Sequence, residues 1–195
     1  MIAAMLKWLS SLKASLATLL NAKSAERISI SITTKIGTLS GPVKSANGKE
    51  LIKMKLQLKR PVSDEFKISS PFGQRIINGK EEFHNGVDFA CPIGTSIYAC
   101  EDGAAFRCGY ENEADHSIGF GLRVWQEIER IENDVKVRYY IYYGHLSKIL
   151  IEEGSHIKKG QEIALSGNTG RTTGPHCHLG VRQKDTKNWL EVEFV

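Results

Sequence analysis

The sequence of 195 residues contains no apolar run of about 18 residues or more, the length that a membrane-spanning helix needs. We therefore expect no transmembrane segment. Lys7 and Lys13 interrupt the apolar stretch near the N-terminus, and this interruption also disfavours a cleaved signal peptide.

Cysteine is scarce, with four residues at positions 91, 100, 108 and 177 and no C-x-x-C pair. So few cysteines exclude a disulfide-dense scaffold, and their spacing disfavours a closed, cysteine-rich metal site. We expect reduced thiols, although the sequence leaves open a disulfide between Cys91 and Cys100 if the protein works outside the cell.

A strong excess of one charge is also missing, because 26 Lys and Arg stand against 22 Asp and Glu, a net charge of +4. The basic residues are dispersed and the aromatic residues are not interleaved with them, so we expect no nucleic-acid partner. With 41% hydrophobic and 25% charged residues, the composition is typical of a globular domain with a proper core.

Hydrophobic periodicity divides the chain into three parts. Residues 1–26 carry apolar side chains at spacings of three and four, which predicts an N-terminal amphipathic helix. Its apolar face would pack on its own domain, on a second copy of the chain, or on a partner such as a virion protein. Residues 27–62 alternate in polarity and predict a small antiparallel β-rich extension, which either extends the main sheet or stands apart. The main domain is then residues 63–195.

The main domain is predicted to be mainly β, with an antiparallel sheet as its core. Leu122–Ile131 and Val135–Tyr143 alternate in polarity around a polar turn, and this pattern predicts a hairpin. No long helix is expected after residue 60. We expect a cleft across one face of the sheet, walled by loops around residues 73–83, 109–118 and 166–175.

The most informative motif is His176-Cys177-His178. Alternate residues of an extended strand share a face, so the two histidines point the same way and Cys177 points the other way. Two adjacent imidazoles suit a divalent cation better than a hydrophobic core, because they repel each other when charged and lose hydration when buried.

A second pair, His84 and Asp88, has a spacing of four, which on a strand also places both side chains on one face. Gly86 between them permits a turn or a close approach of the backbone. Two histidines and a carboxylate are the ligands of many catalytic zinc sites, in which the fourth position is left for water.

His145 is the remaining histidine with a place in such a site. If His84, Asp88 and His178 bind the metal, then His145 and His176 are free to move protons near neutral pH. A metal that polarises a carbonyl, together with such bases, favours hydrolysis of an amide bond.

These residues lie in segments that, in their order along the chain, resemble the lysostaphin-type (LytM-like) zinc metalloendopeptidases, which cut peptide cross-links of bacterial peptidoglycan. The resemblance covers about residues 69–181. It rests on Ser69–Arg75, His84–Ala90, Gly119–Gly121, Tyr143–Leu146, Gly167–Gly170 and Thr173–His178. One departure is Cys177, where the family usually has a bulky apolar residue.

The resemblance implies the lysostaphin-type fold and one Zn²⁺ per chain, held by His84, Asp88 and His178. It implies that His176 acts as general base or orients the attacking water, and that His145 stabilises the oxyanion or donates a proton. The sequence does not distinguish which of these two histidines is the base. The implied partner is a peptidoglycan stem or cross-bridge peptide.

We therefore expect a zinc endopeptidase that is made in the cytoplasm and acts on the cell wall after release on lysis, carriage in a virion, or export. It is either an endolysin of a phage or prophage, or a bacterial remodelling enzyme. The alternative function is a catalytically silent module of the same fold that binds the wall or activates another hydrolase. His116 and His156, which lie among polar and charged neighbours, are expected at the surface.

Overall fold

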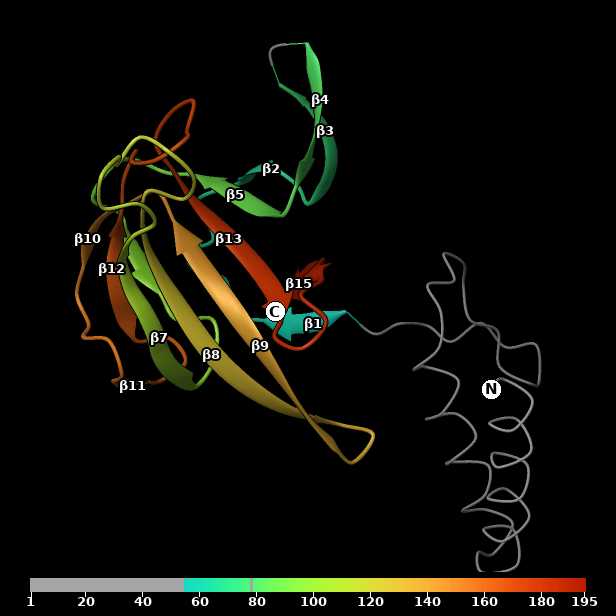
Figure 1. Cartoon of the computed structure of the whole chain (residues 1–195). Helices are drawn as coiled ribbons and strands as arrows, with labels where there is room; N and C mark the ends of the chain where they lie inside the picture. The colour runs from blue at the N-terminus through green and yellow to red at the C-terminus, as the bar shows by residue number, and fades with distance from the viewer. Residues whose placement is uncertain (1–54, 78) are drawn as a thin grey trace, which may run out of the picture. The chain divides into compact units, whose positions relative to one another are not determined.

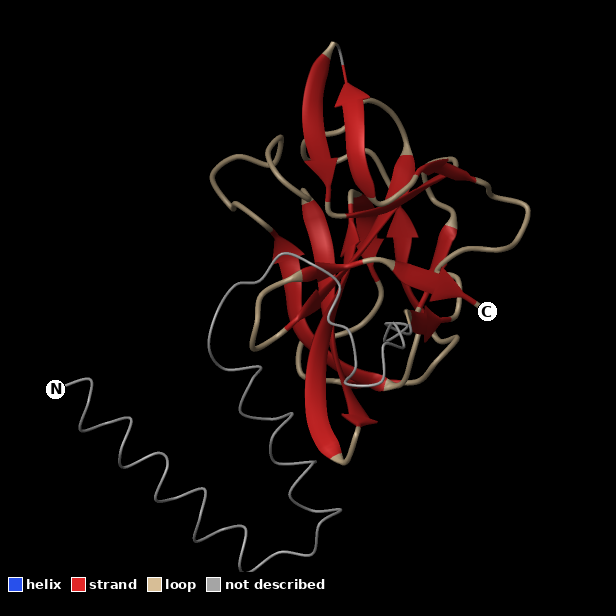
Figure 2. Cartoon of the chain, turned by 90° about the vertical axis from the view of Figure 1, so that its right-hand side faces the viewer, coloured by secondary structure: helices blue, strands red, loops and turns tan. Residues whose placement is uncertain are grey.

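The computed structural model describes residues 55–77 and 79–195, and every regular element within them is a β-strand (Figures 1 and 2). The mainly β, antiparallel fold predicted from the sequence is confirmed. Within this part of the chain, no helix has the length and apolar character that crossing a membrane requires. The helix predicted for residues 1–26, and most of the extension predicted for residues 27–62, lie outside the described residues.

Eight strands form the main sheet, in the spatial order β11-β7-β8-β9-β13-β5-β2 with β14 beside β13. Every pairing in this sheet is antiparallel. Its last long strand, β13, lies between β9 and β5, so residues near the C-terminus meet residues from early in the domain. The strands are β2 (Ile68–Ser70), β5 (Gly86–Ala90), β7 (Gly103–Tyr110), β8 (Leu122–Glu132), β9 (Val135–Gly144), β11 (His156–Ile157), β13 (His176–Gln183) and β14 (Trp189–Leu190).

Three smaller sheets complete the fold. The strands β6 (Ser96–Tyr98), β10 (Leu146–Ile149) and β12 (Glu162–Ser166) form one sheet in the order β10-β12-β6. The strand β1 (Leu56–Leu58) pairs in parallel with β15 (Val192–Phe194). The strands β3 (Gly73–Ile77) and β4 (Lys80–His84) pair only with each other.

The β3–β4 hairpin stands out from the body of the domain (Figure 1). The prediction of a loop over residues 73–83 was therefore wrong. The other two predicted wall segments, residues 109–118 and 166–175, are mostly loop. The first runs on from the end of β7 at Tyr110, and in the second an isolated bridge pairs Gly167 with His176.

The β8–β9 hairpin predicted from the sequence is confirmed. Its two-residue turn consists of Asn133 and Asp134, which have φ angles of 50° and 63°. Positive φ at both central residues is typical of the type I′ turn, whose twist matches that of the flanking strands, and Asn and Asp tolerate this region better than other side chains do.

The hydrophobic core lies on one face of the main sheet and is shared with the three-stranded sheet. Buried residues from both sheets include Val124, Ile141, Tyr143 and Leu179 from the first, and Ile97 and Ile163 from the second. Leu58 and Val62 are also buried in it, so the core begins before residue 63.

Strand β13 alternates between the core and the opposite face of the main sheet, which we call the site face. Cys177, Leu179 and Val181 are buried in the core, and His176, His178, Gly180 and Arg182 lie on the site face. The orientation predicted for the His-Cys-His motif is confirmed. All four cysteines are free, and burial raises the pKa of the Cys100 thiol to about 12.

Candidate metal centre

Strand pairing brings the two halves of the centre together. His178 of β13 lies directly opposite Asp88 of β5, and its Nδ1 atom is 2.8 Å from Oδ1 of Asp88. His84 is the last residue of β4, and β5 begins two residues later at Gly86. His84 and Asp88 therefore belong to two successive strands, and their side chains meet at one site, as their spacing predicted.

Gly86 makes the close approach of β5 to β13 feasible. A Cβ atom on this residue would lie 2.4 Å from the Leu179 carbonyl oxygen and 2.6 Å from Nε2 of His178. Both distances are shorter than van der Waals contact, so the strand pairing requires glycine here.

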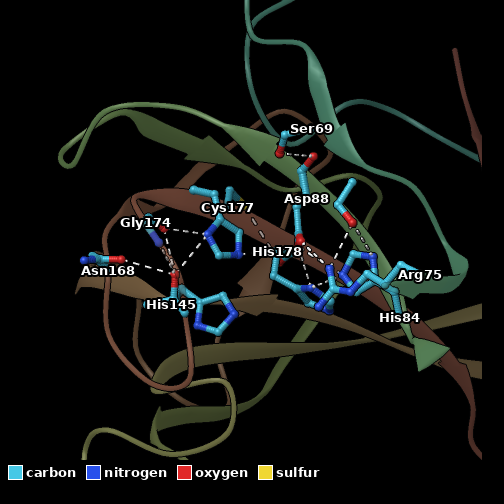
Figure 3. Close-up of polar contacts among 12 residues, drawn as sticks. Ser69, Arg75, His84, Asp88, His145, Asn168, Gly174, Cys177 and His178 are labelled. Carbon is cyan, nitrogen blue, oxygen red and sulfur yellow. Dashed lines mark hydrogen bonds and ion pairs between the residues drawn. The ribbon is translucent and has the colours of Figure 1, made fainter. Parts of the chain in front are cut away.

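Three potential ligand atoms converge at the centre of the site (Figure 3). Nε2 of His84 is 3.1 Å from Oδ1 of Asp88 and 3.2 Å from Nδ1 of His178. All three atoms lie within 4.8 Å of one another, and all three residues are buried. Ligands of a tetrahedral zinc ion at about 2.0–2.1 Å would lie roughly 3.3 Å apart. The triangle therefore fits a small divalent cation after a slight expansion.

Charge also favours a cation in this triangle. Burial opposes ionisation of Asp88, but its close contacts with the imidazoles of His178 and His84 outweigh the burial and hold the pKa of the carboxyl well below its usual value. Burial lowers the pKa of His178, against the opposing effect of Asp88. A negative carboxylate and neutral imidazoles are the protonation states that ligate a metal.

Contacts outside the triangle fix the orientation of the ligands. Nδ1 of His84 lies 2.8 Å from the carbonyl oxygen of Pro71, and a carbonyl only accepts, so Nδ1 carries the proton and Nε2 presents its lone pair. Arg75 donates from Nη1 to Oδ2 of Asp88 at 3.1 Å, which leaves Oδ1 facing the histidines. Nε2 of His178 is buried without a hydrogen-bond partner among the described residues.

Arg75 was not identified as a site residue from the sequence. Its Nε atom donates to Oε1 of Glu82 at 2.8 Å, and Oε2 of Glu82 in turn accepts a hydrogen bond from Arg171 at 2.6 Å. In the sequence, Arg75 stood out only as the last residue of the Ser69–Arg75 motif. That motif supported the family resemblance but indicated no role for the arginine.

His176 lies at the edge of the triangle. Its Nε2 atom is 3.5 Å from Oδ1 of Asp88, and its Nδ1 atom is 2.8 Å from the carbonyl oxygen of Gly174. Because Nδ1 donates to that carbonyl, the neutral ring presents the Nε2 lone pair on the side of the ligand atoms.

His145 lies just beyond the end of β9, as predicted, with its ring centroid 4.6 Å from that of His176. Its φ is 59°, a conformation that residues other than glycine rarely adopt, and its backbone N–H donates to Phe120 at 2.7 Å. Nδ1 donates to the carbonyl oxygen of Thr169 at 2.7 Å, which leaves Nε2 as a base. Burial, followed by the charge of His176, lowers the pKa of His145 to about 4.

A cavity of about 460 Å³ opens beside Asp88 and His176. Its walls come from Ser69–Pro71, Arg75–Ile77 and Thr173–Pro175, so the β3 strand and the loop before β13 face each other across it. A larger open hollow of about 1030 Å³ lies between β7, β8 and β11 and contains none of the five predicted site residues.

The structure thus brings all five predicted residues together. The other two histidines are placed elsewhere: His116 and His156 are both exposed. His116 stacks on Tyr110 with a centroid distance of 3.4 Å in the loop after β7.

Comparison with known proteins gives a consistent result. The sequence profile of peptidase family M23 matches residues 82–189. The chain is 40% identical over 121 residues to the peptidoglycan DD-endopeptidase ShyA of Vibrio cholerae, a match that covers 60% of this chain and 25% of that protein. It is also 40% identical over 103 residues to lysostaphin of Staphylococcus simulans, over 53% of this chain and 18% of that protein. The matches thus span about a fifth to a quarter of the length of these two curated relatives.

Solved structures show the same fold. The catalytic domain of lysostaphin from Staphylococcus simulans superposes with a TM-score of 0.52 at 31% identity, covering 66% of this chain and 90% of that one. A zinc-containing peptidase from Vibrio cholerae superposes with a TM-score of 0.55 at 31% identity, covering 79% of this chain and 44% of that one.

Proposed function

The chain belongs to peptidase family M23, and on this premise we propose that it is a zinc-dependent endopeptidase that hydrolyses amide bonds in peptidoglycan stem or cross-bridge peptides. The observation that carries the proposal is the convergence of His84, Asp88 and His178 on one point, with two further histidines beside it. The names of the relatives, peptidoglycan DD-endopeptidase and lysostaphin, support the substrate class.

We assign His84, Asp88 and His178 as the ligands of one zinc ion. Three protein ligands of this kind leave a coordination position open, whereas structural zinc sites are closed by four. When bound, the ion would supply the Lewis acidity that polarises the scissile carbonyl and activates the attacking water.

His176 and His145 would move the proton. In each ring Nδ1 is committed to a backbone carbonyl, so Nε2 of the neutral ring can only accept. As the water oxygen bonds to the amide carbon, one Nε2 atom takes the water proton. That proton reaches the leaving nitrogen as the C–N bond breaks, given by the imidazolium that then holds it.

We propose His176 as the general base, because its Nε2 atom is within 3.5 Å of a ligand atom. His145 cannot stabilise an oxyanion while it is neutral, since its only N–H is donated to Thr169. It can do so once the water proton has passed from His176 to its Nε2 atom, and its low pKa then favours giving that proton to the leaving amine.

The first test is digestion of purified peptidoglycan followed by mass spectrometry of the released peptides. We expect new amine and carboxyl termini at one cross-link type, loss of this activity with a strong chelator, and its return with zinc. Cleavage that continues after complete removal of the metal would contradict the proposal.

The second test separates the roles of the residues. His178→Ala should lose both metal and activity, whereas His145→Ala should keep stoichiometric metal and lose at least about a hundredfold in kcat, the usual contribution of a positioned acid or base. The matched control is His116→Ala, which removes an exposed imidazole outside the centre. Full activity of His145→Ala would remove that residue from the mechanism.

The bacterial cell wall would be the place of action, whether the chain is released by phage lysis, carried in a virion or exported. The competing proposal, a catalytically silent wall-binding module, gains no support from the centre, because all five residues are present and lie close together. Stoichiometric metal without hydrolysis of any wall peptide would favour it.

A further inference from the structure

The site face of the main sheet carries a second distinctive group of side chains. We define the cation–aromatic band as Phe106, Arg107, Arg123, Trp125, Arg182 and Trp189. Its residues come from four strands, β14, β13, β8 and β7, and the band also passes over β9, which lies between β13 and β8. Adjacent strands lie about 4.8 Å apart, so the band extends roughly 14 Å from β13.

Every arginine of the band lies over an indole ring. The guanidinium carbons of Arg107 and Arg123 are 5.5 and 5.0 Å from the centroid of Trp125, and that of Arg182 is 5.8 Å from Trp189. Stacking of this kind fixes the position of a guanidinium group without using its hydrogen-bond donors.

The band is rich in donors and poor in acceptors. Arg107 and Arg182 make no ion pair with any carboxylate in the described part of the chain, and Arg123 has one at 3.4 Å, with Glu111. Eight buried polar side-chain atoms lack a hydrogen-bond partner among residues 55–77 and 79–195. Five of these atoms belong to the band or to Tyr142: Nε and Nη1 of Arg123, Nε1 of Trp125, the hydroxyl of Tyr142 and Nε of Arg182. The Tyr142 ring packs between those of Trp125 and Trp189.

The band is continuous with the metal centre. A Cβ atom on Gly180 would lie 2.9 Å from the Trp189 ring and 3.2 Å from Nε2 of His178, so the indole and the imidazole lie side by side. Phe120 closes the remaining gap, with ring centroid distances of 5.1 Å to His178 and 6.2 Å to Trp189.

We propose that the cation–aromatic band binds the free carboxylates of the peptidoglycan stem peptide while the scissile bond lies at the metal centre. This inference rests on the proposed function and narrows its substrate class to carboxylate-bearing stem peptides, as opposed to uncharged glycine bridges. An extended peptide rises about 3.4 Å per residue, so about four residues cover the distance from β13 to β7. Arginine suits this role because its planar fork of donors matches a carboxylate.

The test measures wall binding without cleavage. Chelator-treated full-length protein is sedimented with purified peptidoglycan sacculi, and with sacculi whose carboxylates have been converted to amides. We expect amidation to weaken binding of the wild-type chain at least about tenfold, as expected when hydrogen bonds to a charged group are lost. The double variant Arg107→Gln/Arg182→Gln should bind untreated sacculi at least tenfold more weakly, and amidation should then change little.

Lys136→Gln is the matched control. It removes one positive charge at an exposed position on β9, outside the band, where the lysine already pairs with Glu129 at 2.6 Å. Its binding should stay within twofold of the wild-type value. Arg107→Gln alone changes an exposed residue and keeps the test informative if the double variant folds poorly.

Kinetics on the zinc-loaded enzyme provide a second readout. On a defined cross-linked muropeptide dimer, the band variants should raise KM about tenfold and leave kcat within twofold.

Wild-type binding that survives amidation overturns the proposal. So does unchanged or tighter binding by the variants, the latter indicating that the band is covered by another part of the chain. Absence of hydrolysis by the wild-type enzyme would instead refute the proposed function and leave the binding result intact.

Discussion

At the scale of single residues, the centre is organised by where the imidazole protons lie. Three of its four histidines donate Nδ1–H to backbone carbonyls, those of Pro71, Thr169 and Gly174. The sequence identified all four histidines from their spacing and context. It could not identify the carbonyls, because every residue has one and only the folded backbone decides which faces an imidazole.

Arg75 offers the sharpest test of the residues that surround the ligands. Arg75→Gln removes the charged donor to Oδ2 of Asp88, so the carboxylate can rotate away from the histidines. We expect the dissociation constant for zinc to rise about 10- to 100-fold, as for other residues that orient metal ligands, when measured by competition with a chromogenic chelator.

Arg171→Gln is the matched control for Arg75. Arg171 donates to Oε2, the other oxygen of the same glutamate, Glu82, and makes no hydrogen bond or ion pair with Asp88. Its zinc affinity should match that of the wild-type chain. If Arg75→Gln also binds zinc normally, then Arg75 does not orient Asp88.

The low pKa of His145 makes the stability of the metal-free protein depend on pH. The pKa is about 4 in the folded chain and about 6.5 when unfolded, so between these values the unfolded state binds more protons. Stability should therefore be complete above pH 6.5 and fall as the pH drops toward 4, with a loss of about 2 kcal/mol at pH 5. Urea unfolding of apo-protein at pH 8 and pH 5 measures this. The loss should shrink in His145→Gln, and an undiminished loss there would assign it to other groups.

At the scale of strands, two hairpins show what the sequence can and cannot predict. The β8–β9 hairpin was predicted because its apolar residues alternate and an Asn-Asp pair marks its turn. The β3–β4 hairpin was missed because it is rich in polar residues on both sides and pairs with no other strand. Its hydrogen bonds are local, but its position beside the centre depends on tertiary contacts such as that of Arg75 with Asp88.

Gly86 tests the pairing of β5 with β13. In Gly86→Ala the new methyl group would meet the Leu179 carbonyl and the His178 ring, and a backbone atom cannot move aside without separating the strands. We expect a loss of about 1–3 kcal/mol in the free energy of unfolding and a weaker zinc site. Gly174→Ala is the control, since a Cβ atom there meets nothing within 4 Å. Equal urea midpoints for the two variants would contradict this account.

At the scale of the whole molecule, the centre joins residues about 90 positions apart in the chain. The pairing of β13 with β5 and β9 creates it, and such long-range pairing has no local signature. From periodicity alone, an antiparallel β domain with a cleft could be predicted, but not the strand order. The order of motifs along the chain, which resembles a known family, was what placed the five residues together.

Because the ligands come from distant segments, metal binding should stabilise the folded domain as a whole. Zinc at about 100 times its dissociation constant should add about 2.7 kcal/mol to the free energy of unfolding. Differential scanning calorimetry should show a higher Tm with zinc than with chelator, and His84→Ala should remove the difference. An equal Tm in zinc and in chelator would indicate that the triangle holds no ion.

The two-sided character of β13 limits how this protein can change in length. Its odd-numbered residues fill the interior and its even-numbered residues carry the chemistry, so inserting or deleting one residue near its start would exchange the two sets. Arg182 would then point into the hydrophobic core, and Val181 would lie on the site face. The strand therefore tolerates insertions and deletions only in steps of two residues.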